Sequence, residues 1–405
     1  MIINMKRPQS WKNKSYPGVS ILKIMQLFLA VILIGVQQLL FFVPVKKSRI
    51  MLFAYKREGL SCNPKYIALQ LKEKYGDDAE LIWLSMYPNT CDDARLLGFK
   101  VIKYNSLQNI IMYLRTNVFI TNDCFPVWAS HLNHVWINTW HGAMNYKHIG
   151  YEYIEPMNWT VWKLFLLKNR QADYFLAGSK FFAENTVDSF QYDPKIFLAS
   201  GLPRNDLLVN QTVDKAELRR RILGDHLDPS THLVMYAPTF RLGEKPSTHE
   251  LDINSCLEIL EKRFGGHWVM LFRNHVFIKD SCADSQQFID VSGYKDMQEL
   301  LYISDVLISD YSSCMYDFIL QRRPCFVYAP DMEQYREHDR SFAYSPDKWP
   351  YSIAVTNTQL QNNILNYNQA CFEKKVSQHF ADTCSYDKGT ACNSIISLIE
   401  QLCDL

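Results

Sequence analysis

The sequence predicts an α/β protein in which two Rossmann-like domains with parallel sheets face each other across a cleft. Short apolar runs of strand length recur along the body of the chain, and helix-like segments separate several of them. The pattern forms two series that meet near residues 201–204. Parallel strands are buried on both faces and are connected by helices, so this alternation is typical of doubly wound sheets. A chain of 405 residues is also long enough for two or three domains.

The first series occupies residues 47–203, which we expect to form the N-terminal domain. Its apolar runs fit buried strands at Ile50–Tyr55, Leu81–Ser85, Val101–Tyr104, Val118–Thr121, Val135–Thr139, Tyr174–Ala177 and Ile196–Ala199. Helices are expected at Pro64–Tyr75, Leu107–Leu114 and Lys180–Phe190. The first of these opens with a proline, whose missing N–H costs nothing in the first turn of a helix.

The second series occupies residues 204–405, which we expect to form the C-terminal domain. Strands are predicted at Leu233–Ala237, Trp268–Arg273, Val306–Ser309 and Cys325–Tyr328, and helices at Lys215–Leu223, Ile253–Phe264 and Cys314–Leu320. The segment Cys392–Leu402 has a helical pattern, and we expect it to pack back across the domains.

Residues 1–46 differ in kind from the rest of the chain. A basic stretch without acids precedes the apolar run Ile21–Val43, and Lys46 and Lys47 follow it. No small-residue cleavage site follows the run, which disfavours a secretory signal. Because basic residues flank both ends, we favour a helix lying in the cytoplasmic leaflet, attracted by anionic lipids. A transmembrane span and a buried core helix remain alternatives, and all three place the body in the cytoplasm.

Composition excludes several classes of function. With 43 Lys and Arg against 42 Asp and Glu, the net charge of +1 gives no support for nucleic-acid binding. The 11 cysteines are scattered and contain no Cys-x-x-Cys pair, so neither a disulfide framework nor a zinc site is indicated. No other metal cluster is predicted either, and the cysteines are consistent with a reducing compartment.

A candidate general base follows the predicted strand Val135–Thr139. His141 and Gly142 stand where the strand ends, at the edge of a parallel sheet that binds ligands. A histidine titrates near neutral pH and can remove a proton, while the adjacent glycine lets a substrate approach closely. The alternative is a strand-end histidine satisfied by the backbone.

Further candidates lie at the interdomain connection and at two other strand ends. Arg204, after a proline, could position a phosphate through its planar guanidinium, although a turn with a surface arginine is an alternative. Thr239 and Arg241 follow one strand of the second series, and Arg273 and His275 follow the next. For these two clusters the alternative is a charged loop without a ligand.

The segment Asp305–Asp317 is the most informative. An apolar strand ends at Asp310, and Ser312 and Ser313 then open a predicted helix. Free N–H groups at a helix start, the positive end of the helix dipole and two hydroxyls together favour a phosphate site. The alternative is that one serine simply caps the helix.

These clusters together favour phosphate chemistry. Cations and hydroxyls dominate them, which suits stabilisation of a pyrophosphate. The clusters do not suit a retaining glycosidase, which needs a pair of carboxylates. The sequence contains no P-loop, which argues against a P-loop kinase, and no Gly-x-Ser-x-Gly motif, which argues against an α/β-hydrolase. A nucleotide-sugar glycosyltransferase and an inactive scaffold for envelope assembly remain alternatives.

The chain resembles the CDP-glycerol:poly(glycerophosphate) glycerophosphotransferases of teichoic acid and capsule polymer synthesis. Two departures from the family pattern are Leu202, in place of an aromatic residue, and Val276, in place of proline. The segments that carry the resemblance are Asn63–Tyr66, Asn138–Gly142, Ala177–Lys180, Gly201–Asp206, Tyr236–Arg241, Arg273–His275, Asp296–Leu301 and Asp305–Asp317.

The resemblance implies a GT-B-like fold, with the acceptor on the N-terminal domain and the nucleotide mainly on the C-terminal one. The reaction implied is transfer of glycerol phosphate from CDP-glycerol to a lipid-linked polyprenyl diphosphate glycan, at the cytoplasmic face of the membrane. Ribitol phosphate from CDP-ribitol is the alternative. No cofactor is predicted, and a divalent cation bound through substrate phosphates stays open. The residues implied are His141 and His275 in catalysis, Arg273, Ser312, Ser313, Thr239, Arg241 and Asp310 at the donor, and Arg204 and Gly142 in positioning.

Overall fold

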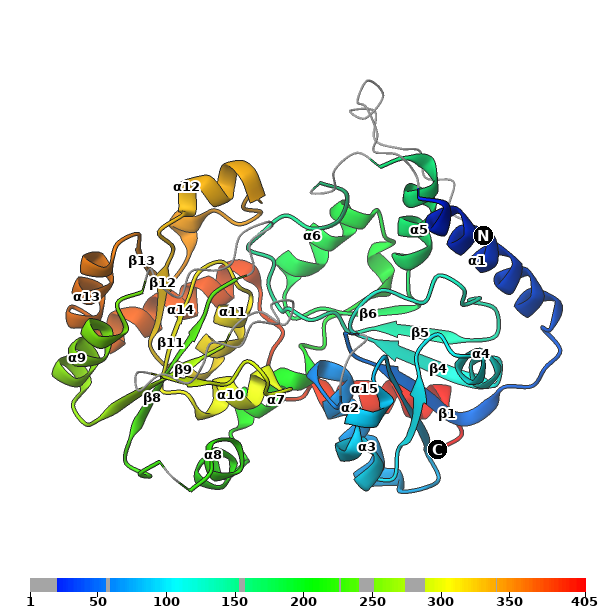
Figure 1. Cartoon of the computed structure of the whole chain (residues 1–405), viewed down its shortest axis with the longest axis horizontal. Helices are drawn as coiled ribbons and strands as arrows, with labels where there is room; N and C mark the ends of the chain where they lie inside the picture. Colours follow the sequence, from blue (N-terminus) through cyan, green and yellow to red (C-terminus); the bar gives the residue numbers. More distant parts are fainter. Residues whose placement is uncertain are drawn as a thin grey trace.

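The computed structural model describes residues 20–55, 59–152, 157–225, 227–239, 251–273, 288–339 and 341–405. Two lobes lie side by side, and each has a parallel sheet with helices against its faces (Figure 1). The predicted fold class, two facing doubly wound α/β units, is therefore confirmed.

The N-terminal lobe contains a seven-stranded sheet in the order β3-β2-β1-β4-β5-β6-β7, and all of its pairs are parallel. The two end strands are short, and the central β1 pairs with both β2 and β4. The strands are β1 (Lys46–Phe53), β2 (Glu80–Ser85), β3 (Lys100–Lys103), β4 (Thr116–Thr121), β5 (Val135–Asn138), β6 (Tyr174–Leu176) and β7 (Phe197–Leu198).

Side chains on the central strand alternate between two apolar layers, as the strand period requires. Ile50 and Leu52 join a cluster with α2 (Cys62–Tyr75) and α15 (Ala391–Leu402). Met51 and Phe53 point to the opposite layer, which contains residues of α4 (Leu107–Tyr113). Helices α3 (Asp92–Leu96), α5 (Trp159–Lys168) and α6 (Lys180–Phe190) complete this lobe.

The C-terminal lobe contains a six-stranded parallel sheet in the order β10-β9-β8-β11-β12-β13. Its strands are β8 (His232–Ala237), β9 (Trp268–Phe272), β10 (Phe288–Asp290), β11 (Val306–Ser309), β12 (Cys325–Tyr328) and β13 (Ser352–Ala354). One face packs against α9 (Ile253–Phe264) and α13 (Asn357–Leu365), and the other against α10 (Met297–Ile303) and α11 (Cys314–Phe318). The edge strands β10 and β13 were not predicted, because each has only three residues, most of them not fully buried, and gives no distinct apolar run.

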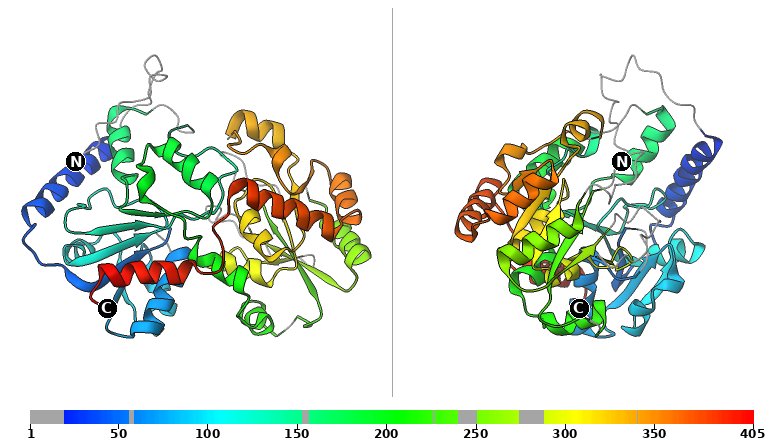
Figure 2. Two further views of the ribbon diagram at one scale, coloured as in Figure 1. Left: turned by 180° about the vertical axis from the view of Figure 1, so that it is seen from behind. Right: turned by 60° about the vertical axis from the view of Figure 1, so that its left-hand side comes forward.

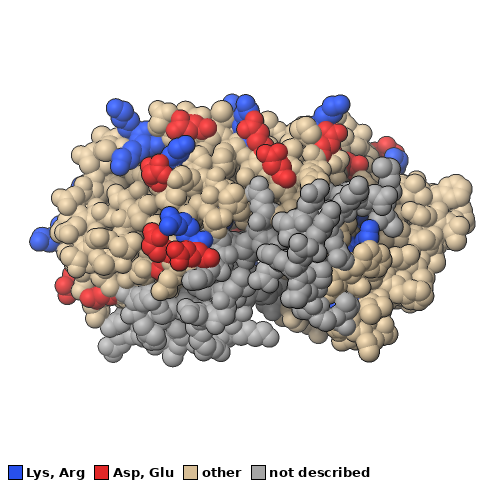
Figure 3. All heavy atoms as spheres, turned by 90° about the horizontal axis from the view of Figure 1, so that it is seen from above, with Lys and Arg blue, Asp and Glu red and all other residues tan. Residues whose placement is uncertain are grey.

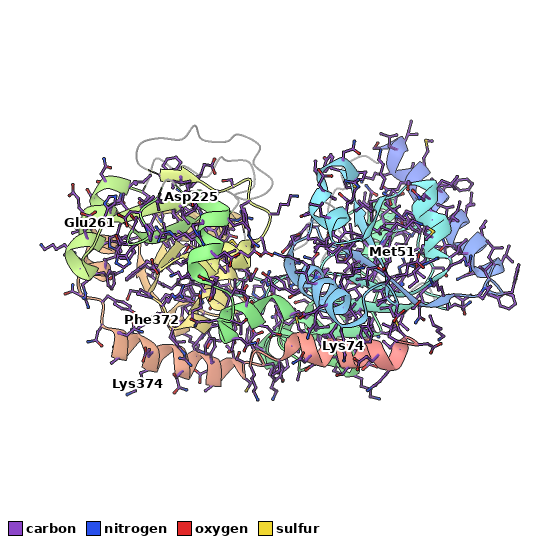
Figure 4. All side chains as sticks on the ribbon, turned by 90° about the horizontal axis from the view of Figure 1, so that it is seen from below. Met51, Lys74, Asp225, Glu261, Phe372 and Lys374 are labelled. Atoms are coloured by element: carbon purple, nitrogen blue, oxygen red, sulfur yellow. The ribbon has the colours of Figure 1, made fainter. Side chains whose placement is uncertain are left out.

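The remaining helices are α7 (Asp206–Asn210), α8 (Lys215–Leu223), α12 (Met332–Gln334) and α14 (Gln369–Thr383). The chain leaves α14 on the second lobe and returns to the first, where α15 lies against it (Figure 2). Seen from below, Lys74 of α2 lies beside α15 (Figure 4), and its ammonium pairs with Glu400.

Polar contacts as well as a shared apolar cluster join the lobes. The ammonium of Lys65 on α2 lies 2.6 Å from Asp296 and 2.8 Å from Glu299 of the second lobe. On another side, the hydroxyl of Tyr146 lies 2.8 Å from that of Tyr351. The relative orientation of the two lobes is therefore fixed by directional polar contacts in addition to apolar packing.

Helix α1 (Ile21–Leu39) lies on the outer side of the N-terminal lobe and is long and apolar enough to cross a membrane. Gln37 fastens it to the lobe, because its amide donates to Trp128 O at 2.7 Å and accepts from Ser130 N at 2.9 Å. Most of its large apolar side chains are exposed, with Phe28 69% accessible, so α1 is not a buried core helix. The end of the molecule that carries α1 is almost free of charge among the described residues (Figure 3, right).

Candidate active site

His141 lies in the loop that follows β5, at the carboxyl edge of the N-terminal sheet. Its Nδ1 lies 2.7 Å from the carbonyl oxygen of Asn122, the residue after β4. A carbonyl can only accept, so Nδ1 carries the proton and the lone pair is on Nε2. This tautomer is the one that a general base needs.

The loop that carries His141 is held from several sides. The indole of Trp140 stacks on the imidazole with 4.6 Å between ring centroids. Trp140 has a φ of 49°, and its N–H donates to Asn138 Oδ1 at 2.9 Å. The amide of Asn63, at the start of α2, donates to the carbonyls of Thr139 and Trp140 at 3.0 and 2.9 Å. The imidazole is therefore fixed in orientation before any substrate binds.

Electrostatics favour the neutral form of His141. Burial lowers the pKa of the imidazole below its usual value, and the hydrogen bond to Asn122 only partly offsets this effect. A histidine with a lowered pKa is deprotonated at neutral pH and can accept a proton.

Gly142 brings the His141 loop against the second lobe. A Cβ added at Gly142 would lie 2.9 Å from Ser313 Oγ and 3.3 Å from Ser313 Cβ. The candidate base and the candidate phosphate site, 172 residues apart in the chain (313 minus 141), therefore meet across the boundary between the lobes.

Replacing Gly142 with alanine is expected to reduce turnover by about tenfold to 10²-fold, because the methyl group displaces Ser313 from the His141 loop. Steady-state kinetics on the purified variant will measure this loss. Gly293→Ala is the matched control, since nothing lies within 4 Å of a Cβ at that position. Equal activity of both variants would show that the Gly142–Ser313 approach is unimportant.

Ser312 and Ser313 stand at the start of α11, as predicted, and both are half-buried. The Ser313 side chain makes no capping hydrogen bond, while Ser312 Oγ accepts only a long one of 3.3 Å from Cys314 N. Ordinary helix capping therefore does not account for Ser313, and its hydroxyl faces Gly142 of the other lobe.

Asp310 and Thr239 hold two strand ends of the second lobe together. Both carboxylate oxygens of the buried Asp310 accept the N–H of Thr239, at 3.0 and 2.9 Å, and the Thr239 hydroxyl also donates to the carboxylate. Asp310 also accepts Tyr311 N at 2.5 Å. In the structure these two residues are engaged with each other, an arrangement that shapes the loops around Ser312.

Arg273 directly follows β9 in the second lobe. Its Nη1 donates to the carbonyls of Val291 and Tyr294 at 3.0 and 2.7 Å, which fixes the direction of the guanidinium. Burial lowers the pKa of Arg273, and Asp296 is the largest of the influences that oppose this. A desolvated, oriented cation of this kind is suited to a pyrophosphate.

Arg204 lies at the hinge and is 4% exposed. Its Nη2 lies 2.5 Å from Asp317 of α11, and its Nη1 lies 3.4 Å from Cys62 Sγ. Burial alone lowers the pKa of Arg204, but the Asp317 carboxylate raises it overall. In the structure Arg204 thus joins the lobes through a buried ion pair, which differs from the surface turn considered above and from a direct phosphate clamp.

Asp387 extends this buried polar cluster. It accepts Leu202 N at 2.7 Å and Asn205 Nδ2 at 3.2 Å. Burial raises the pKa of Asp387 to about 7. Arg241 and His275 lie outside the described residues, and within those residues no group of three or more metal-ligating side chains is found.

Comparison with known proteins identifies the family. Residues 36–401 match the family model described as CDP-Glycerol:Poly(glycerophosphate) glycerophosphotransferase. The chain belongs to this family.

Two teichoic acid polymerases are similar to this chain in sequence. It is 29% identical over 375 residues to a teichoic acid poly(glycerol phosphate) polymerase of Staphylococcus epidermidis, covering 88% of this chain and 51% of that protein. It is 27% identical over 376 residues to the same-named protein of Bacillus spizizenii, covering 87% and 92%. The chain thus spans about half of one relative and nearly all of the other.

A solved structure shows the same fold. The histidine-to-alanine variant of the wall teichoic acid polymerase TagF matches this glycerophosphotransferase-family chain with a TM-score of 0.77 and 26% identity, covering 95% of this chain and 98% of that one. A histidine-to-asparagine variant soaked with CDPG matches with a TM-score of 0.76.

Four residues of this site were not predicted from the sequence. Asn63 and Asp317 lie inside recognised motif segments, but nothing in the sequence pairs Asp317 with Arg204. Asn122 directly follows β4, and Tyr55 stands two residues after the end of β1. The strand-end rule that selected His141 selects these two as well, and it could have found them.

Proposed function

We propose that this protein transfers glycerol phosphate from CDP-glycerol to a hydroxyl of a lipid-linked acceptor and releases CMP. The observation that carries the proposal is the approach of the His141 loop to Ser313 across the lobe boundary. Family membership supports the donor, and a related structure was soaked with CDPG.

The residues have complementary roles in this reaction. Nε2 of His141 takes the proton of the acceptor hydroxyl, whose oxygen attacks the phosphorus that bears glycerol. The bond from that phosphorus to the bridging oxygen breaks, and CMP leaves with the electron pair. Arg273, with Ser312 and Ser313, stabilises the charge that develops on the leaving phosphate.

A specific observation favours ribitol phosphate as the second candidate. A teichoic acid ribitol-phosphate primase of Bacillus spizizenii is 24% identical over 316 residues, covering 74% of this chain and 77% of that protein. The two donors differ only in the polyol, so the same proton transfer and the same leaving group serve either one.

The deciding experiment incubates the membrane fraction with CDP-glycerol or with CDP-ribitol and follows CMP. We expect release from CDP-glycerol that depends on added lipid-linked acceptor. Preference for CDP-ribitol would assign the second candidate, and no CMP from either donor would overturn the proposal. The number of units added per acceptor, measured by gel, then separates a primase from a polymerase.

Replacing both Ser312 and Ser313 with alanine is expected to weaken CDP-glycerol binding about tenfold or more, because hydrogen bonds to a charged phosphate are lost. Isothermal titration with CDP-glycerol will measure the change. Ser106→Ala is the matched control, since Ser106 caps α4 away from the site. Unchanged donor affinity in the double variant would contradict the phosphate site.

Membrane attachment through α1 is the second part of the proposal. The helix is fastened by Gln37 along one side and leaves its other apolar side chains exposed, as expected of a helix lying in the cytoplasmic leaflet. This arrangement would hold the protein at the membrane, where a lipid-linked acceptor resides.

Replacing Phe28 and Leu29 with glutamate is expected to reduce binding to anionic vesicles by about tenfold or more, because two exposed apolar side chains no longer enter the bilayer. Vesicle flotation will measure the change. Leu107→Glu/Ile111→Glu changes two exposed apolar residues of α4 and is the control. If both variants bind as the parent protein does, α1 is not the anchor.

A further inference from the structure

Tyr55 stands at the carboxyl end of β1, next to the candidate base. Its backbone N–H donates to Asn122 Oδ1 at 3.0 Å, and the carbonyl of the same Asn122 accepts Nδ1 of His141 at 2.7 Å. One residue therefore fixes both Tyr55 and His141. The two rings meet edge to face, with 5.5 Å between centroids.

The backbone of Tyr55 is in the left-handed region, with a φ of 50°. Such a conformation is uncommon for a bulky residue and persists only where the surroundings enforce it. Two neighbours share it, Cys62 with a φ of 55° and Trp140 with a φ of 49°. Strained residues of this kind gather at functional sites. Here Tyr55 and Trp140 both contact the His141 imidazole, and Cys62 contacts the Tyr55 hydroxyl.

The Tyr55 hydroxyl lies beside the start of α2, close to the hinge residue Arg204. It donates to Cys62 Sγ at 3.4 Å, and Nη1 of Arg204 donates to the same sulfur at 3.4 Å. Tyr55 also interacts electrostatically with Arg273. The phenol thus lies next to the His141 imidazole and shares the Cys62 sulfur with Arg204, and 37% of the residue's surface is exposed.

The phenol is suited to donate a hydrogen bond and not to accept a proton. Desolvation, followed by the neighbouring Cys62, raises the pKa of Tyr55 well above its usual value. Its present partner is a sulfur, which is a weak acceptor, so exchanging that partner for a phosphate oxygen costs little and gains a charge-assisted bond.

Resting on the proposed function, we propose that Tyr55 is a further catalytic residue whose hydroxyl donates to a non-bridging oxygen of the phosphate during transfer. His141 acts on the attacking oxygen and Arg273 on the leaving group, and Tyr55 lies beside His141 and influences the pKa of Arg273. The phosphoryl group passes through this space as the bond to the acceptor forms. A hydrogen-bond donor to charge that develops in the transition state typically raises kcat about 10²-fold or more.

The test compares Tyr55→Phe with the parent enzyme on CDP-glycerol. We expect kcat to fall about 10²-fold, while the Kd for CDP-glycerol stays within about threefold, because the bond strengthens only in the transition state. Tyr87→Phe is the matched control: it removes an exposed phenol that follows β2 on the same lobe. Thermal melts of all three proteins confirm that they are folded.

A second readout distinguishes contact from structural support. CDP-glycerol with sulfur in place of one non-bridging oxygen on the transferred phosphorus is prepared as separate diastereomers. The parent enzyme should discriminate between them, and Tyr55→Phe should lose much of that discrimination, which a purely structural change would leave intact. If Tyr55→Phe melts early, 3-fluorotyrosine at position 55 retains the ring and strengthens the donor, so the discrimination should grow.

The outcomes separate the two proposals. No CMP release by the parent enzyme from either donor overturns the proposed function itself. An active parent enzyme with equal kcat in Tyr55→Phe, or with unchanged diastereomer discrimination, overturns only the assignment of Tyr55.

Discussion

Replacing His141 with alanine is expected to reduce CMP release about 10²–10⁴-fold while CDP-glycerol affinity changes less than about threefold. The imidazole is fixed by Asn122 and Trp140 with its lone pair on Nε2 and is placed to act on the acceptor, whereas the donor is expected to contact the other lobe. Single-turnover rates and titration with donor measure the two quantities separately.

The pH dependence provides a further check on the same residue. A general base is active when deprotonated, and burial lowers the pKa of His141. The acid limb of kcat should therefore lie below pH ~6.5, the ordinary value for histidine, and should be absent in His141→Ala. His267→Ala removes an exposed imidazole of the second lobe and should change neither the rate nor the limb. Near-normal turnover in His141→Ala would exclude it as the base.

Replacing Asp317 with alanine is expected to lower the free energy of unfolding by about 3–5 kcal/mol, because Arg204 would remain as a buried, unpaired cation. The pair is 2.5 Å long, and the two side chains are 5% and 1% exposed. Denaturant unfolding followed by tryptophan fluorescence will measure the loss.

A matched control separates burial from charge pairing. Asp92→Ala breaks an exposed pair with Arg95, whose side chains are 81% and 42% accessible, and should cost less than about 1 kcal/mol. The double variant Arg204→Met/Asp317→Leu removes both buried charges and should recover much of the stability lost in Asp317→Ala. A loss in Asp317→Ala no greater than that in Asp92→Ala would mean that the buried pair is not stabilising the hinge.

The sequence was most informative where local pattern and topology act together. Central strands such as β11 were predicted at their observed bounds, because three consecutive apolar residues followed by a serine, all buried, give a clear strand-length run. The strand-end rule located His141 and Ser313, and the facing of the two lobes brings the His141 loop to Ser313 although the two are far apart in sequence.

The contacts in the interior of the hinge could not be predicted by such rules. Whether Arg204 faces a ligand or Asp317 depends on packing between residues 113 positions apart. No local pattern in the sequence indicates that two residues so far apart in the chain will pair. Asn122 illustrates the same limit, since its role comes from two hydrogen bonds to residues in the loops that follow the neighbouring strands β1 and β5.

The return of α15 to the first lobe has a consequence for how the protein can be divided. Ile395, Ile396 and Ile399 of α15 fill the same apolar layer as Ile50 and Leu52 of β1. A fragment that ends at residue 203 lacks this helix and would expose the layer to water. The two lobes are therefore not separable modules: the first reaches its final form only after the whole of the second has been synthesised.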